Sequence, residues 1–476
     1  MLFNSIHFFI FFPLVAITYF LISVRFKSTV LLLASIYFYA IYSPPYLILL
    51  FYSIALTYYS VHWMEKATSK NKKLLFLNLA VWGNLLLLFV FKYLDFAIKV
   101  WNQTFSILSI AETPIPYAGI FLPMGISFYS IQAIAYAVDV YRGEVHKAKS
   151  LAHFALFLSF FPQLVAGPIL RAKDTMHQLL HSFPFSQENF RVGISYIALG
   201  LFRKTIFADS ISRVVDQAYA NPSLYSGFAL FVASCLFSVQ IYCDFAGYSD
   251  IAIGTARIFG YKFPLNFREP FLAKSITEIW RRWHISLTSW LRDYIYISLG
   301  GSKVSILRNY FNIFITTFAS GLWHGADWTF IIWGTLNALF IVIEKFLFGF
   351  PKILEFYEKI PHLFRSLYGF FFFTMSVIFF RSRAVESIGS GVEVASHILK
   401  RIFTFADGRS LSLGGFSLVL LGIVILIDLQ REKNYEFLRN IFEIPLVRNT
   451  IFGVIFLTCL LIYGVSVDQP FLYFQF

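Results

Sequence analysis

The stretch LLFLNLAVWGNLLLLFVF, residues 74–91, decides the fold class of this protein. It carries no charged side chain over about 18 residues, a length at which an apolar helix can cross the hydrocarbon of a bilayer. Further apolar runs occur at residues 8–24, 228–239, 330–343 and 416–427. Some are shorter than a full span, which suits tilted, broken or re-entrant helices that line a cavity. The pattern predicts an all-α polytopic membrane protein with roughly 11–13 membrane helices and re-entrant segments.

The composition agrees with a chain that lies mostly in lipid. Of its 476 residues, 58% are hydrophobic, 20% are aromatic and 14% are charged, whereas about 25% are charged in an average soluble domain. No repeat, low-complexity tract or polar linker divides the chain into soluble domains. We therefore expect a single membrane domain over residues 1–476.

The positive net charge indicates a membrane surface rather than a nucleic acid. The formal net charge is +13, and basic loops that set the topology and meet anionic lipid account for most of it. A nucleic-acid partner would need a soluble basic face, and the sequence offers none. A basic cytoplasmic surface can also attract an anionic donor such as an acyl-CoA.

Polar residues interrupt the apolar pattern in the middle of the chain, where an ionisable side chain at bilayer depth costs about 3 kcal/mol or more. The segment at residues 240–250 contains Asp244, Tyr248 and Asp250. On a helix the two carboxylates lie about 240° apart, so they do not share a face. A paired acid and base is therefore disfavoured, and we expect these groups to tie neighbouring elements together by hydrogen bonds.

A second polar segment, residues 278–293, holds a histidine among arginines and tryptophans. If this segment is one helix, Trp280, Trp283, Leu287 and Trp290 form one stripe, and Arg281, His284, Thr288 and Arg292 form the neighbouring stripe. An interfacial amphipathic helix explains the tryptophans and arginines but not the histidine. Alternatively, Arg281 and Arg282 hold a phosphate or carboxylate while His284 positions a substrate. Both interpretations remain open from the residues alone.

A third segment places His324 between Leu322-Trp323 and Gly325, and two apolar runs flank it. The neighbouring glycine allows a substrate or another backbone to approach the ring closely. A buried histidine that only satisfies hydrogen bonds is the alternative, but a polar ring at membrane depth is costly without a function. We favour a general base at His324, with Asp327 either orienting the imidazole one helical turn on or contacting solvent.

Four motifs, taken together, resemble the membrane-bound O-acyltransferase family, and in particular its bacterial branch of alginate O-acetylases and D-alanyl-lipoteichoic-acid enzymes. They occur in the family order and are, in this chain, YCDFAGYSD (residues 242–250), NFREP (266–270), WRRWHISL (280–287) and GLWHG (321–325). The resemblance extends from about residue 121 to residue 344 and includes the ending FLYFQF at residues 471–476. C-terminal helices are expected at about residues 366–476.

The resemblance implies a ring of membrane helices around a central funnel in a multi-pass protein of the bacterial cell inner membrane. It implies that His324 is catalytic and that His284 is a second functional histidine. Asp244, Tyr248, Arg281, Arg282 and Asp327 are expected to support substrate or structure. It also implies an acyl group taken from a cytoplasmic thioester, with acetyl-CoA as the expected donor substrate. No bound cofactor or metal is expected. The expected partner is an extracytoplasmic acyltransferase or carrier protein that completes O-acetylation of a polysaccharide such as alginate.

Other classes of function have weaker support. The chain contains no G-x-S-x-G turn, no H-E-x-x-H zinc pair and no Walker A loop. D-Alanyl transfer to teichoic acid and peptidoglycan O-acetylation remain open because they would use the same fold and mechanism. A polysaccharide or lipid transporter also remains open, although no inverted repeat is apparent.

Overall fold

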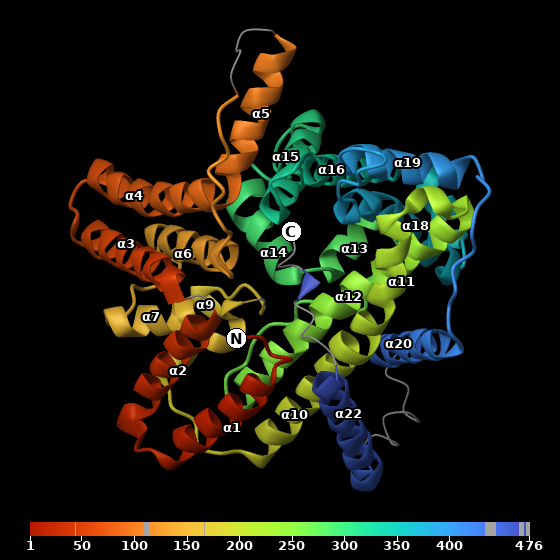
Figure 1. Ribbon diagram of the computed structural model, residues 1–476. Coiled ribbons are helices and arrows are strands. Elements are labelled where there is room, and N and C mark those ends of the chain that lie inside the picture. The colour runs from red at the N-terminus through yellow and green to blue at the C-terminus, as the bar shows by residue number, and fades with distance from the viewer. Residues whose placement is uncertain (43, 109–113, 166, 434–443, 466–470, 473–476) are drawn as a thin grey trace. The chain divides into compact units, whose positions relative to one another are not determined.

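The computed structural model describes residues 1–42, 44–108, 114–165, 167–433, 444–465 and 471–472 (Figure 1). Within these ranges the chain is helical and forms no strand, with two isolated backbone bridges. The all-α architecture predicted from the apolar runs is therefore confirmed. Residues 473–476, which end the C-terminal stretch that resembles the family, lie outside the described residues.

The chain divides into two compact units. The first unit comprises Met1–Ile197 and Ile251–Pro264, and the second comprises Ala198–Asp250 and Leu265–Phe476. The division falls within α10 (Gln187–Leu201) and within α12 (Gly227–Ile258). The expected single membrane domain over residues 1–476 stays a prediction.

The first unit is built from short and medium helices joined by polar contacts. Its helices are α1 (Ile6–Leu21), α2 (Lys27–Tyr42), α3 (Leu47–Lys66), α4 (Lys70–Leu88), α5 (Leu94–Ile107), α6 (Ile126–Tyr141), α7 (Leu151–Ser159), α8 (Phe161–Leu164), α9 (Ala172–Thr175) and most of α10. Asn84 of α4 is fully buried and bridges to α3, because its Oδ1 accepts from Ser53 Oγ at 2.6 Å and its Nδ2 donates to Thr57 Oγ1 at 3.0 Å. A buried amide satisfied in this way fixes the pairing of two otherwise apolar helices.

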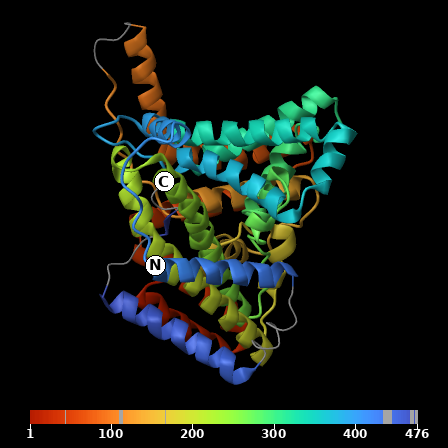
Figure 2. The ribbon, with the colours of Figure 1, turned by 90° about the vertical axis from the view of Figure 1, so that its right-hand side faces the viewer.

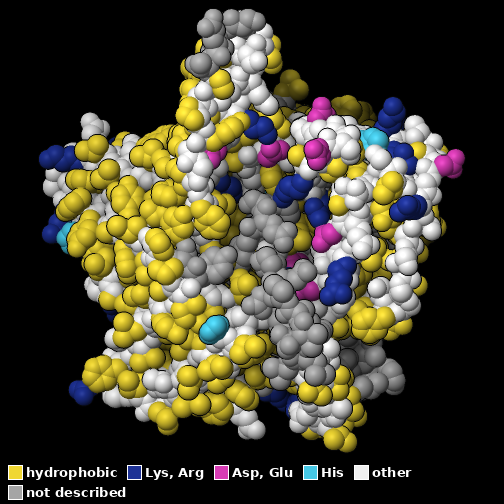
Figure 3. Space-filling view, in the orientation of Figure 1, with side chains coloured by type: hydrophobic (Ala, Val, Ile, Leu, Met, Phe, Trp, Pro, Cys, Tyr) yellow, Lys and Arg dark blue, Asp and Glu magenta, His cyan; other side chains and the backbone are white. Residues whose placement is uncertain are grey.

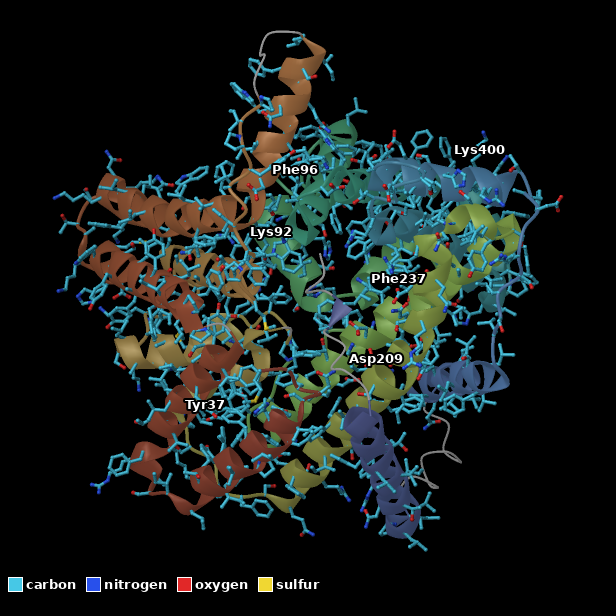
Figure 4. The ribbon with its side chains drawn as sticks, in the orientation of Figure 1. Tyr37, Lys92, Phe96, Asp209, Phe237 and Lys400 are labelled. Atoms are coloured by element: carbon cyan, nitrogen blue, oxygen red, sulfur yellow. The ribbon has the colours of Figure 1, made fainter. Side chains whose placement is uncertain are left out.

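A π-helical turn, Phe89–Tyr93, separates α4 from α5, and the two helices run in different directions (Figure 1). Lys92, labelled in Figure 4, lies in this turn, and its Nζ donates to Ser127 Oγ at 3.3 Å. The chain then returns alongside α5. Asn102 holds this return by hydrogen bonds to both the N–H and the carbonyl of Ile115, at 2.9 and 2.8 Å.

The second unit contains the residues that the motifs single out. Its helices are α11 (Asp209–Ala220), most of α12, α13 (Ile276–Arg282), α14 (Ile285–Leu291), α15 (Ile306–His324), α16 (Trp328–Leu347), α17 (Pro351–Lys359), α18 (His362–Arg381), α19 (Gly391–Phe403), α20 (Gly415–Lys433) and α22 (Pro445–Val465). Two π-helical turns, Phe202–Ala208 and Arg292–Tyr296, interrupt the regular helices. α15 and α16 lie side by side in both views (Figures 1 and 2), because Gly321 and Gly334 meet backbone to backbone.

Six helices among the described residues are long and apolar enough to cross a membrane. They are Val24–Ile41, Pro44–Lys66, Lys70–Ile107, Gly227–Ile258, Trp328–Leu347 and His362–Arg381. Two shorter apolar helices, Ile6–Leu21 and Pro445–Cys459, fall below that length. The sequence-based number of roughly 11–13 membrane segments included re-entrant segments and stays a prediction. The central funnel also stays a prediction.

The surface of the first unit supports a lipid environment for its helices. Leu75, Leu79, Trp82 and Leu86 recur on α4 at helical spacing and are 62%, 45%, 65% and 58% exposed. Figure 3 shows hydrophobic side chains covering the face over α3 and α4. A continuous apolar stripe of this kind is unfavourable in water and is expected where hydrocarbon surrounds a helix.

Candidate active site

The second unit brings His284 and His324 together. The centroids of the two imidazole rings lie 6.5 Å apart, and the side chains are 1% and 5% exposed. His324 is the last residue of α15, which ends there because Gly325 turns extended at φ −162°. The motifs at residues 280–287 and 321–325 therefore meet at one place, although they are distant in the sequence.

The interpretation of residues 278–293 as one interfacial amphipathic helix is wrong. Residues 278–293 do not form a continuous helix, because His284 adopts the left-handed conformation at φ +42° and separates α13 from α14. Left-handed backbone is costly for a residue with a Cβ atom, by roughly 1–2 kcal/mol, so neighbouring contacts must hold it. The tryptophan and arginine stripes of a single interfacial helix are consequently absent.

Asn266 supplies those contacts. Its carbonyl accepts a hydrogen bond from Ile285 N at 2.8 Å, and Arg268 N donates to Arg282 O at 2.9 Å. The Asn266 Oδ1 atom lies 3.1 Å from His284 Nδ1 and also accepts from Ser286 N at 3.2 Å and Ser286 Oγ at 2.8 Å. The motif NFREP contributed to the family resemblance, but sequence reasoning gave Asn266 no role. The signal available in the sequence was the presence of an asparagine in that motif, directly before Phe267.

Aromatic rings surround both histidines and keep the site apolar. Phe245 of α12 meets the His284 ring edge to face at 4.6 Å, and Trp323 lies 5.7 Å from it. Trp333 and Phe380 lie 4.9 and 5.4 Å from the His324 ring. Burial lowers the pKa of His284 from its ordinary 6.5 to about 3, because an apolar setting disfavours the imidazolium. His284 is therefore neutral at physiological pH.

Close packing of α15 against α16 fixes the backbone that carries His324. A Cβ atom at Gly321 would lie 2.6 Å from Phe330 O and 2.9 Å from Gly334 Cα. Only glycine permits the two helices to approach this closely, three residues before His324.

The two arginines of the motif differ in their surroundings. Arg281 is exposed, and no hydrogen bond links it to either histidine among the contacts described. Arg282 is 6% exposed, and its guanidinium bonds Glu278 at 2.6 and 2.9 Å and Glu432 at 2.8 and 3.1 Å. Because two carboxylates already occupy Arg282, its position favours structural support over recognition of an anionic substrate.

Asp244 and Asp250 lie in a buried network of charged groups. Lys204 Nζ donates to Asp244 Oδ1 at 2.6 Å and to Asp209 Oδ1 at 2.7 Å, and Asp209, labelled in Figure 4, begins α11. Arg203 pairs instead with Asp250, at 2.8 Å. The carboxylates thus bind different partners, in keeping with their predicted separation around the helix.

The C-terminal stretch packs on the same part of α12. Leu472 N donates to Asp244 Oδ2 at 3.0 Å, and the Phe471 ring lies 4.8 Å from Tyr248 and 5.3 Å from Phe245. Tyr248 is fully buried. Its ring packs against Phe471, which in turn contacts Phe245.

Asp327 is not one helical turn beyond His324 within a helix, because α15 has already ended. It is the N-cap of α16, and its Oδ1 accepts from Thr329 N at 3.0 Å. Its orienting role toward the imidazole stays a prediction. Over the described ranges, no cluster of three histidine, cysteine, aspartate or glutamate residues has the geometry of a metal site.

Comparison with known proteins gives a consistent result. Residues 144–383 match the model of the membrane-bound O-acyltransferase family. The chain is 38% identical over 344 residues to the probable alginate O-acetylase AlgI of Pseudomonas aeruginosa, covering 72% of this chain but 65% of that protein. It is 32% identical over 498 residues to the protein of the same name from Pseudomonas putida, covering 99% of both. It is also 34% identical over 431 residues to the peptidoglycan O-acetyltransferase of Helicobacter pylori, covering 81% of this chain and 78% of that protein.

Proposed function

Because this chain belongs to the membrane-bound O-acyltransferase family, we propose that it moves an acetyl group from a cytoplasmic thioester across a bacterial inner membrane for O-acetylation of an extracytoplasmic polysaccharide. The family makes the chain an acyltransferase, and the six apolar helices make it a multi-pass membrane protein. The donor, the direction of transfer and the inner membrane belong to the proposal.

The observation that carries the proposal is the pair of buried histidines, with ring centroids 6.5 Å apart. A general base acts within about 3 Å of the proton that it removes. Two rings at this separation can therefore both reach one reacting centre. The aromatic lining favours chemistry there, because exclusion of water strengthens electrostatic interactions with the developing charge.

The proposed reaction converts a thioester and an alcohol into an ester and a thiol. His324 accepts the proton of the acceptor hydroxyl as its oxygen attacks the thioester carbonyl carbon. The carbon–sulfur bond then breaks, and the protonated His324 returns the proton to the thiolate. His284, backbone amides or Arg281 support the acyl donor or the oxyanion. A positioned acid–base group contributes about 10²- to 10⁴-fold to the rate.

Acetyl-CoA is the proposed donor substrate, without a bound cofactor. The names of the two Pseudomonas relatives support acetyl transfer to alginate, and that of the Helicobacter relative supports acetyl transfer to peptidoglycan. A hydroxyl on a polymer outside the cell would be reached through a partner, either an extracytoplasmic acyltransferase or a carrier protein. Membrane lipid is the expected environment, and no nucleic-acid partner is expected.

The test is the O-acetyl content of cell-surface polysaccharide in a deletion strain that carries wild type, His324→Ala or His397→Ala. His397 lies on α19 and bonds the exposed Ser223, so it is the matched control. We expect acetyl to be lost on deletion and restored by wild type and by His397→Ala. We expect His324→Ala to be present in the membrane at normal abundance and to restore none.

The other outcomes separate the alternatives. Normal acetylation with His324→Ala would rule out this residue as the base. Acetyl content that does not change on deletion, together with a loss of D-alanine esters, would replace the acetyl donor by an aminoacyl donor. A polymer that remains inside the cell on deletion, with its esters intact, would favour transport.

A further inference from the structure

Asn266 determines which nitrogen of His284 carries the proton. We infer that Asn266 is a positioning residue that holds His284 as the tautomer protonated at Nδ1, so that Nε2 meets the substrate as a hydrogen-bond acceptor. This inference rests on the proposed function for the role of His284, but the tautomer itself follows from the contacts of Asn266.

The first step is the orientation of the Asn266 amide. The backbone N–H of Ser286 points at one terminal atom of this side chain, at 3.2 Å. A backbone N–H can only donate, so the atom that it faces must be the oxygen. The other terminal atom, Nδ2, then donates a hydrogen bond to Ser249 Oγ at 3.1 Å. A hydroxyl oxygen can accept such a bond. If the amide were reversed, its NH₂ group would face the backbone N–H of Ser286, and two hydrogen-bond donors would oppose each other in a buried site.

The second step is the proton on His284. Its Nδ1 lies 3.1 Å from the same Asn266 oxygen. Two acceptors at this distance would repel, so Nδ1 must carry the proton and donate it. The hydroxyl of Ser286 does not offer Nδ1 a competing donor, because it bonds Asn266 Oδ1 at 2.8 Å and lies 3.5 Å from Nδ1.

The third step is the rigidity of the arrangement. Asn266 is 1% exposed, and its carbonyl also binds Ile285 N at 2.8 Å. One residue therefore stabilises the left-handed backbone of His284 through its main chain and the imidazole through its side chain. Both contacts would be lost together if this segment moved.

The consequence concerns the part that His284 plays in acyl transfer. A neutral imidazole with its proton on Nδ1 has a lone pair on Nε2. Such a ring can accept a hydrogen bond from the acceptor hydroxyl, but it cannot donate one to an oxyanion. Of the roles open to His284, the contacts of Asn266 therefore select orientation of the hydroxyl and exclude stabilisation of the oxyanion.

The test compares substitutions of Asn266 with the same substitutions of Asn84, a buried asparagine of the first unit with three hydrogen bonds of its own. Asn266→Asp keeps an acceptor toward Nδ1 and Ser286 N, whereas Asn266→Ala removes it. Asn84→Ala and Asn84→Asp reproduce the loss of a buried amide far from the histidines in the sequence.

Two readouts are measured on full-length protein in liposomes. The first is the ¹⁵N spectrum of histidine-labelled protein, in which the His284 signals are those missing from His284→Gln. The second is release of thiol from acetyl-CoA in the presence of isolated cell-surface polysaccharide and the extracytoplasmic protein fraction of the source cells, which supplies the proposed partner. We expect the neutral Nδ1-protonated tautomer in wild type and both Asn84 variants, and a mixture of tautomers in Asn266→Ala. In Asn266→Asp we expect Nδ1 to keep its proton and the pKa of His284 to rise, because a carboxylate beside the ring stabilises the imidazolium. We expect kcat to fall about 10- to 100-fold in Asn266→Ala, with KM for acetyl-CoA within about twofold of wild type.

An unchanged His284 spectrum in Asn266→Ala, or an equal loss of kcat in Asn84→Ala, would overturn the inference. A failure of the proposed function gives a different result. If wild type releases no thiol from acetyl-CoA, the donor assignment fails, while the ¹⁵N spectra alone still decide whether Asn266 sets the tautomer.

Discussion

Replacing Arg203 by methionine should destabilise the second unit strongly. Arg203 is 2% exposed and lies in the π-helical turn Phe202–Ala208. Its guanidinium donates to Asp250 Oδ2 at 2.8 Å, to Asp428 Oδ1 at 2.8 Å and to Tyr242 Oη at 3.3 Å. Methionine has a similar length but no donor, so the substitution leaves two buried carboxylates without their common cation.

The loss of unfolding free energy depends on which buried charges remain paired after each substitution. Removing one partner of a buried ion pair costs about 3–5 kcal/mol, because the other charge remains buried. Arg203→Met leaves both Asp250 and Asp428, so we expect about 5 kcal/mol. Asp428→Asn leaves Arg203 bonded to Asp250, so we expect about 1–3 kcal/mol, the cost of one impaired buried hydrogen bond. The double substitution should cost less than the sum of the two, by at least about 1 kcal/mol.

The assay is unfolding of purified protein in mixed micelles with increasing SDS, followed by circular dichroism. Lys359→Met is the control, because Lys359 pairs with Glu355 on α17 and the two side chains are 72% and 68% exposed. An exposed pair of this spacing contributes about 0.3–0.5 kcal/mol. A midpoint for Arg203→Met that matches Lys359→Met would refute the reasoning. So would a larger loss for Asp428→Asn than for Arg203→Met.

Two further predictions concern the histidines. Because the pKa of His284 is about 3 in the folded chain and 6.5 in the unfolded chain, the unfolded chain binds the extra proton between these values. The free energy of unfolding of wild type should therefore fall relative to that of His284→Gln as the pH falls through this window, by up to about 1.4 kcal/mol per pH unit. A difference in unfolding free energy that stays constant with pH would contradict this. Gly321→Ala should lower acyl transfer about 100-fold, because its Cβ would lie 2.6 Å from Phe330 O and force α15 away from α16. Gly422→Ala is its control, since no described atom lies within 4 Å of that Cβ, and equal activity of the two variants would argue against the packing role.

The helical architecture was predictable because it depends on local composition. A run such as residues 74–91 can satisfy its backbone in hydrocarbon only as a helix, whatever surrounds it. The convergence of His284 and His324 was reached only through a family resemblance. No periodicity relates residues 280–287 to residues 321–325, and the contact arises from the packing of α13, α14 and α15.

The break at His284 was not predictable from its own neighbourhood. Residues 278–293 have a good helical pattern, and nothing in that pattern marks residue 284 as left-handed. The cause lies 18 residues earlier, in the hydrogen bonds of Asn266. Asp327 is a similar case, since its distance in sequence from His324 suggested one helical turn, whereas Gly325 ends the helix between them.

One stretch of α12 separates the charged network from the histidine. Phe245 and Ser249 are four residues apart and share a face of the helix, where they contact His284 and Asn266 respectively. Asp244 and Asp250 point elsewhere, toward Lys204 and Arg203.

This separation has a functional reason. A carboxylate beside His284 would stabilise the imidazolium and raise its pKa, whereas the face that α12 presents to it is apolar or neutral. The buried charges can thus hold the helices of the second unit together without protonating the histidine. The loss expected for Arg203→Met is accordingly a loss of folded protein, and the molecules that remain folded should retain the His284 tautomer.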